Sequence, residues 1–150
     1  MDSLVLIMLI GLPRSGKSTE AARLHKEHGY PIVCPDAIRL ALHGQRFVAS
    51  AEEMVWATAK LMVRSLFRAG HGTVVLDATN ISRARRDLWR HDSEWVRNFV
   101  VALTPASECI RRANTSERLD LVAVINKMLD QFDEPNAADE NASIKVISHE

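Results

Sequence analysis

The stretch GLPRSGKST, residues 11–19, is the part of the sequence that most strongly indicates the fold of the chain. It fits the pattern G-x-x-x-x-G-K-[ST], in which the backbone N–H groups of a tight loop surround a phosphate. Gly11 and Gly16 allow the curl that turns those N–H groups inward. Lys17 brings a positive charge to the β- and γ-phosphates, and the Ser18 hydroxyl is placed to hold Mg²⁺. We therefore expect a nucleoside triphosphate to bind at this loop, through Gly11, Pro13, Arg14, Ser15, Gly16, Lys17, Ser18 and Thr19.

The flanking residues support this interpretation. Residues 4–10 (LVLIMLI) form an unbroken apolar run that predicts a buried parallel strand. Residues 19–28 predict a helix whose positive dipole end faces the phosphates. The alternative is a structural glycine-rich turn, but the order strand, loop and helix favours phosphate binding.

Composition limits the class of protein. With 150 residues and 47% hydrophobic content, we expect one domain over residues 1–150. Nineteen basic and 19 acidic residues give a net charge of zero, which argues against a protein that coats nucleic acid but allows a local basic site. The two cysteines lack metal-site spacing and indicate a reducing compartment. Because the first apolar run is too short to cross a bilayer, we expect a cytoplasmic protein without a membrane partner.

Strand and helix patterns alternate along the chain. Further strands are expected over residues 30–34, 73–77, 99–103 and 144–147, and helices over 37–42, 50–69, 82–95 and 121–132. This alternation predicts an α/β fold, with a five-stranded parallel sheet covered by helices on both faces. Ligands of such sheets bind beyond the carboxyl ends of the strands, where the loop, Asp36 and Asp77 all follow a strand.

Helix ends and packing faces can also be predicted. A capping box at Ser50 and Glu53 indicates where the longest helix begins, and Ser82 and Thr104 are further N-cap candidates. Apolar spacing predicts which side chains of the longest helix face the core: Met54, Thr58, Leu61, Met62, Ser65 and Leu66. The same spacing in the last helix predicts Val122, Ile125, Met128, Leu129 and Phe132 as inward residues.

Transfer of a phosphoryl group needs a group that orients or deprotonates the acceptor, and Asp36 is the candidate base. Arg39 follows three residues later and shares its helical face. The alternative is that Asp36 only caps the helix that begins at Ala37. Asp77 resembles a Walker-B carboxylate that holds Mg²⁺ directly or through water, or it fixes Arg39 or Lys17 by an ion pair. Thr79 and Asn80 either reach nucleotide or acceptor, or form the turn.

Two groups of arginines suggest roles in binding anions. Arg112 and Arg118 flank a polar break, which suits a small mobile lid over about residues 111–120; the alternative is a solvated helix face. A second group either grips an acidic acceptor or is ordinary surface, and consists of Arg83, Arg85, Arg86 and Arg90.

Several motifs together resemble the P-loop kinases built like the kinase domain of phage polynucleotide 5′-hydroxyl kinase. They are GLPRSGKST, VCPDAIR, VVLDATN, the offsets of Arg85, Arg86 and Trp89, and CIRRANTSER through FDEP. The resemblance covers nearly the whole chain and implies a P-loop NTPase three-layer sandwich with a small helical lid. It implies that Lys17 and Ser18 serve ATP and Mg²⁺, that Asp36 is the general base, and that Arg39 grips the acceptor. It further implies that Asp77 supports the acceptor site and that Arg112 and Arg118 are lid arginines. We also expect Thr79, Asn80 and Arg86 at the substrate.

The expected function is therefore an ATP-dependent kinase whose acceptor is a hydroxyl on nucleic acid, a 5′-hydroxyl end in the first instance. A 5-hydroxymethyluracil base in DNA and a small molecule such as an antibiotic are alternatives, because relatives in this group use diverse acceptors. A regulatory NTPase is disfavoured, since the nearest match to a base-reading N/T-K-x-D is the run from Asn126 to Leu129, which lacks the aspartate.

Overall fold

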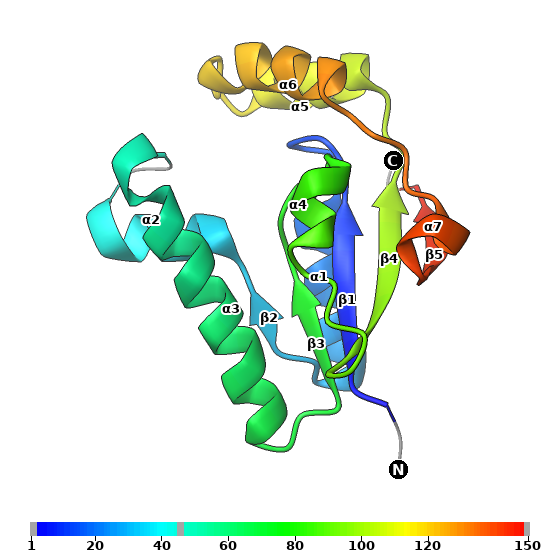
Figure 1. Ribbon diagram of the computed structural model, residues 1–150. Helices are drawn as coiled ribbons and strands as arrows, with labels where there is room; N and C mark the ends of the chain where they lie inside the picture. The colour runs from blue at the N-terminus through cyan, green and yellow to red at the C-terminus, as the bar shows by residue number, and fades with distance from the viewer. Residues whose placement is uncertain (1–2, 45–46, 149–150) are drawn as a thin grey trace.

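The computed structural model describes residues 3–44 and 47–148, and in them five parallel strands form one sheet (Figure 1). The strand order is β2-β3-β1-β4-β5, so β1 lies between β3 and β4. This arrangement confirms the predicted parallel α/β sheet. The strands are β1 (Val5–Ile10), β2 (Ile32–Val33), β3 (Thr73–Leu76), β4 (Val96–Ala102) and β5 (Ala142–Ile147).

Helices cover both faces of the sheet because side chains alternate between the faces along each strand. Ile7 and Leu9 of β1 pack with α1, while Leu6, Met8 and Ile10 pack in the cluster that contains α3. The helical segments are α1 (Lys17–His28), α2 (Pro35–His43), the 3-10 turn η1 (Ala49–Ala51), α3 (Glu52–Arg68), α4 (Arg83–Asp87), α5 (Ala106–Thr115), α6 (Asp120–Asp130) and α7 (Ala137–Glu140). None of the helices in the described part of the chain is both long enough and apolar enough to span a bilayer.

Helices α5 and α6 lie together above the carboxyl ends of the strands, apart from the two layers that cover the sheet (Figure 1). They have a small core of their own, in which Cys109, Ala113, Leu121 and Ile125 are buried. Leu12 of the phosphate-binding loop is buried in the same cluster. The residues predicted as a lid, 111–120, thus belong to a longer helix pair, α5 and α6, which packs directly on the loop.

The predicted packing face of α3 is wrong by one residue. The buried row is Val55, Ala59, Val63 and Phe67, whereas Met54 and Leu61 are 53% and 63% exposed. Both rows are largely apolar, so spacing alone did not separate them; of the predicted row, Leu66 is partly buried against the core. The capping box is also absent, because Ser50 lies in η1 and α3 begins at Glu52 without a side-chain cap.

Other boundaries differ in ways that reflect tertiary packing. Ser82 caps α4 as predicted, but the helix ends at Asp87 and the following chain buries Trp89 and Trp95 in the core. Thr104 does not cap α5, whose N-cap is Pro105. A short helix, α7, forms after Asn136, and β5 begins two residues earlier than expected. In α6 the predicted inward residue Leu129 is 49% exposed, and Leu121 is buried with Ile125.

Candidate functional site

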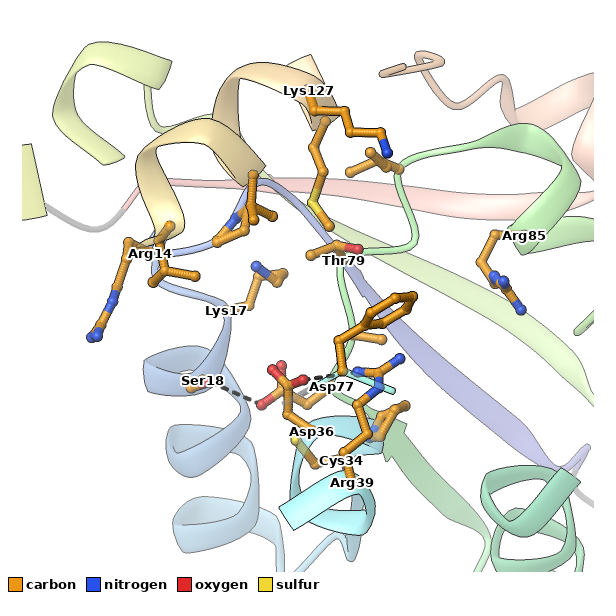
Figure 2. A pocket seen from close by; sticks show the side chains of 18 of the residues that line it. Arg14, Lys17, Ser18, Cys34, Asp36, Arg39, Asp77, Thr79, Arg85 and Lys127 are labelled. Carbon is orange, nitrogen blue, oxygen red and sulfur yellow. Dashed lines mark hydrogen bonds and ion pairs between the residues drawn. The ribbon is translucent and has the colours of Figure 1, made fainter. Parts of the chain in front are cut away.

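A cavity of about 940 Å³ opens at the carboxyl ends of the strands. Its wall comes from the phosphate-binding loop, α2, the start of α3, the loop after β3 and α6 (Figure 2). The predicted residues that line it are Pro13, Arg14, Gly16, Lys17, Ser18, Thr19, Asp36, Arg39, Asp77, Thr79 and Arg112. One cavity therefore brings together the predicted nucleotide loop and the predicted acceptor residues.

The loop has the backbone that its glycines predict. Gly16 has φ 104° and Arg14 has φ 67°, both in the left-handed region. A Cβ on Gly11 would meet Ser15 Oγ at 2.6 Å and the Ala102 carbonyl oxygen at 3.1 Å, so only glycine fits there. Gly11 and the fully buried Ser15 do not line the cavity, and they shape the loop from inside.

Lys17 lies at the base of the loop and is only 8% exposed. Its ammonium group donates to the Leu12 carbonyl oxygen at 2.7 Å and contacts Ser15 Oγ at 3.5 Å. Burial lowers the pKa of Lys17 to about 8, a shift that the negative charge of Asp77 partly opposes. A phosphate placed in the loop would favour the charged form.

Ser18 and Asp77, the two residues predicted to hold Mg²⁺, lie in direct contact. Ser18 Oγ donates to Asp77 Oδ2 at 3.0 Å, across 59 residues of sequence. Burial raises the pKa of Asp77, and the Ser18 hydrogen bond and the Lys17 charge oppose this shift. A hydroxyl beside a carboxylate is the set of oxygen donors that suits Mg²⁺ with a nucleotide. Neither Lys17 nor Arg39 forms an ion pair with Asp77 within 4.0 Å in the described structure, although the charge of Lys17 still acts on Asp77.

Asp36 and Arg39 lie on α2 and line the same cavity, and Figure 2 shows the Asp36 carboxylate close to Asp77 and Ser18. Asp36 Oδ1 accepts from Arg39 Nη1 at 2.8 Å. Arg39 also donates through Nε and Nη2 to both carboxylate oxygens of Glu52, at 2.8 and 2.7 Å. Asp36 lies in the first turn of α2, whose N-cap is Cys34, so it does not act as the predicted helix cap. With its side chain 57% exposed, the Asp36 carboxylate is held in place yet open to a ligand.

The two predicted lid arginines differ in position. Arg112 lines the cavity, where its Nη1 donates to the Arg14 carbonyl oxygen at 3.1 Å and its Nε to Glu108 at 3.0 Å. Arg118 does not line the cavity, and it pairs with both carboxylate oxygens of Asp120 at 2.9 and 2.8 Å. The structure thus brings Arg112, and not Arg118, to the predicted nucleotide loop.

Two predicted substrate residues, Asn80 and Arg86, lie in the interior and not in the cavity wall. Arg86 is fully buried and forms an ion pair with the equally buried Glu140 at 2.8 Å. Asn80 donates through Nδ2 to the Leu9 carbonyl oxygen at 2.8 Å, and its own carbonyl accepts from Arg86. This corrects the prediction: Asn80 fixes the loop after β3 to β1, and Arg86 joins that loop to α7. Thr79 does line the cavity, and its carbonyl accepts from the N–H of Gly11.

Some residues of the cavity wall are absent from the predicted site. Glu52 accepts hydrogen bonds from Arg39. The Trp56 ring contacts the guanidinium groups of Arg39 and Arg85, whose central carbons lie 5.7 and 4.1 Å from the ring centre. Lys127 reaches the cavity from α6. The spacing of Glu52 and Trp56, four residues apart at the start of a helix, is a signal that they share one face.

Comparison with known proteins gives one family and a set of structures. The family model described as "AAA domain" matches residues 6–135. Two chains from structures of the Pnkp1/Rnl/Hen1 complex, one of them titled an RNA repair complex, are 28% and 20% identical. They cover 75% and 89% of this chain with TM-scores of 0.68 and 0.67, whereas this chain spans less than half of each, 40% and 47%.

The Mycobacterium tuberculosis APS kinase, in complex with AMPPNP and APS, is 19% identical. The match covers 100% of this chain and 92% of that one, with a TM-score of 0.68. A search of curated proteins finds no match. The structural matches agree with the predicted three-layer fold, in which helices cover a parallel sheet and the phosphate-binding loop follows β1.

Proposed function

Because this chain belongs to the AAA domain family and has the fold of the P-loop kinases, we propose that it is an ATP-dependent kinase that phosphorylates a hydroxyl on nucleic acid. The favoured acceptor is a 5′-hydroxyl end. The observation that carries the proposal is the placement of the Asp36–Arg39 pair in one cavity with Lys17, Ser18 and Asp77.

The donor half of the site would bind the triphosphate. The loop's N–H groups and Lys17 face the β- and γ-phosphates, and Ser18 and Asp77 would hold Mg²⁺. When bound, that ion would neutralise charge on the phosphates. Arg112 approaches the loop from the lid and adds positive charge over the transferred group.

The acceptor half would supply the base. Asp36 accepts the proton of the acceptor hydroxyl while the hydroxyl oxygen forms a bond to the γ-phosphorus. The bond between that phosphorus and the β,γ-bridging oxygen breaks, and ADP is released. Arg39 orients Asp36 through its 2.8 Å hydrogen bond, and Glu52 fixes Arg39 in turn. Asp36 thus has a defined position before the acceptor binds.

Nucleic acid is favoured over a small acceptor for two reasons. The Pnkp1/Rnl/Hen1 chains include the most similar of the matches given above, at 28% identity. The acceptor side also contains an aromatic ring and two guanidinium groups, which suit a base and its phosphates. A small-molecule acceptor is the second candidate, because the APS kinase matches this chain over 92% of its own length.

The test offers γ-labelled ATP and Mg²⁺ with a set of acceptors: 5′-hydroxyl DNA and RNA oligonucleotides, DNA containing 5-hydroxymethyluracil, APS, and no acceptor. We expect label on the 5′-hydroxyl oligonucleotides. Label on APS alone would support the small-molecule candidate. ADP release that no acceptor increases would contradict kinase activity altogether.

A further inference from the structure

We infer that Arg85 is a specificity-determining residue that binds a phosphate of the acceptor, adjacent to the hydroxyl that Asp36 activates. This inference rests on the proposed function, and it goes further because it states which acceptors the site prefers. An acceptor with a phosphate next to its hydroxyl, such as a nucleotide at a 5′ end, would bind better than the same alcohol without phosphate.

Arg85 differs from its neighbours in how its charge is satisfied. Arg39 is held by Asp36 and Glu52, and Arg112 by Glu108. Within residues 3–44 and 47–148, by contrast, the Arg85 side chain forms neither a hydrogen bond nor an ion pair, although it lines the cavity. The Glu52 carboxylate acts on Arg85 only through space and is itself bonded to Arg39, so the Arg85 guanidinium in the cavity wall is available to an anion.

The surroundings of Arg85 prepare that group for binding. Its guanidinium carbon lies 4.1 Å from the centre of the Trp56 ring, which restricts its orientation. The N–H of Arg85 donates to Ser82 Oγ at 3.1 Å, which fixes the first turn of α4. Burial lowers the pKa of Arg85, yet a guanidinium keeps its charge at neutral pH. A rigid, partly desolvated cation therefore faces the cavity.

Its position assigns Arg85 to the acceptor rather than to ATP. In Figure 2, Arg85 lies on the right of the view and the loop residues Arg14 and Lys17 lie on the left, and the charges that act on Arg85 are those of Glu52 and Arg39 of the acceptor side. The planar fork of the guanidinium matches two oxygens of one phosphate. A sugar-acid carboxylate is the other common source of such an anion, so the experiment must separate the two.

The experiment compares Arg85→Gln and Arg85→Lys with the matched control Arg83→Gln. Arg83 lies on the same short helix but pairs with Asp87 and does not line the cavity. The acceptors are a nucleoside and its 3′-monophosphate, each with a free 5′-hydroxyl, and gluconate. We expect Arg85→Gln to lower the ratio of kcat/KM for the 3′-monophosphate over the nucleoside by about tenfold or more. Arg85→Lys should lower it less, and Arg83→Gln should leave it unchanged.

Binding of the nucleoside 3′-monophosphate to the full chain, measured by calorimetry without turnover, gives an independent result. Failure of the wild-type protein to phosphorylate any hydroxyl would contradict the proposed function. Even then, weaker binding of the 3′-monophosphate by Arg85→Gln than by Arg83→Gln would support the phosphate site. Equal affinities for wild type and Arg85→Gln would overturn the inference. A loss confined to gluconate would overturn it as well, since the anion would then be a carboxylate.

Discussion

At the scale of single residues, the buried ammonium group of Lys17 links nucleotide binding to pH. Burial lowers the pKa of Lys17 to about 8, so the group loses its charge as the pH rises from 7 to 9. Phosphates of ATP would favour the charged form, and binding at pH 9 would then include uptake of a proton. We expect the Kd for ATP to rise by up to about tenfold between pH 7 and pH 9.

Calorimetry in two buffers with different ionisation enthalpies measures both the Kd and the proton uptake. The Lys17→Ala variant provides the comparison, because its remaining affinity should not show this pH dependence. Equal Kd values for the wild-type protein at pH 7 and pH 9, with no proton taken up, would contradict the prediction.

The second prediction at this scale concerns Asp36, whose role in chemistry is distinct from nucleotide binding. Asp36→Asn keeps a side-chain oxygen for Arg39 but removes the base, so kcat should fall by ~10²–10⁴. The Kd for ATP should change little, because the Asp36 side chain accepts from Arg39 and not from the phosphate-binding loop. Glu53→Gln, an exposed neutralisation on α3, is the control. An Asp36→Asn variant that loses ATP affinity and keeps its kcat would show that Asp36 serves the nucleotide.

At the scale of elements, Thr104 connects the end of β4 to the phosphate-binding loop. Its Oγ1 donates to the Ser15 carbonyl oxygen at 2.7 Å, and both residues are buried. Thr104→Val keeps the shape but leaves that carbonyl without this donor, a change that costs about 1–3 kcal/mol. We expect the free energy of unfolding in urea to fall by that amount, and the Kd for ATP to rise because the loop is less well fixed.

Thr115→Val is the matched control for that prediction. The Thr115 hydroxyl donates to the Arg111 carbonyl oxygen at 2.9 Å, but on an exposed turn of α5. Its loss should change stability by less than about 0.5 kcal/mol. The same urea midpoint for both variants would mean that the Thr104 bond does not support the loop.

The order of the elements was predictable because each strand is a short apolar run and each ligand residue follows one. The face of α3 was not, since Met54 and Leu61 are as apolar as the buried row. Arg86 was predicted at the substrate because its neighbours are basic, but its partner Glu140 lies 54 residues further along. Local patterns do not encode such a pairing, and the same holds for Glu52 with Arg39, 13 residues away.

At the scale of the whole molecule, a buried group of charges joins the C-terminal segment to the centre of the fold. Glu140 of α7 accepts from Arg86 of α4 at 2.8 Å and from the N–H of Asn136 at 2.9 Å. Arg97 of β4 donates to the carbonyl oxygens of Arg86 and Glu140. These contacts fix the segment that leads into β5, the edge strand beside β4.

Glu140→Ala should therefore destabilise the protein as a whole, because it leaves the Arg86 guanidinium buried without its carboxylate. Loss of one partner of a buried ion pair costs about 3–5 kcal/mol, and urea unfolding measures it. Glu134→Ala, at an exposed position, is the control and should change stability by less than about 0.5 kcal/mol. Because the cost comes from the uncompensated charge, the double variant Arg86→Leu/Glu140→Leu should be more stable than Glu140→Ala. A double variant less stable than the single one would show that the pair itself, and not the isolated charge, holds the C-terminal segment.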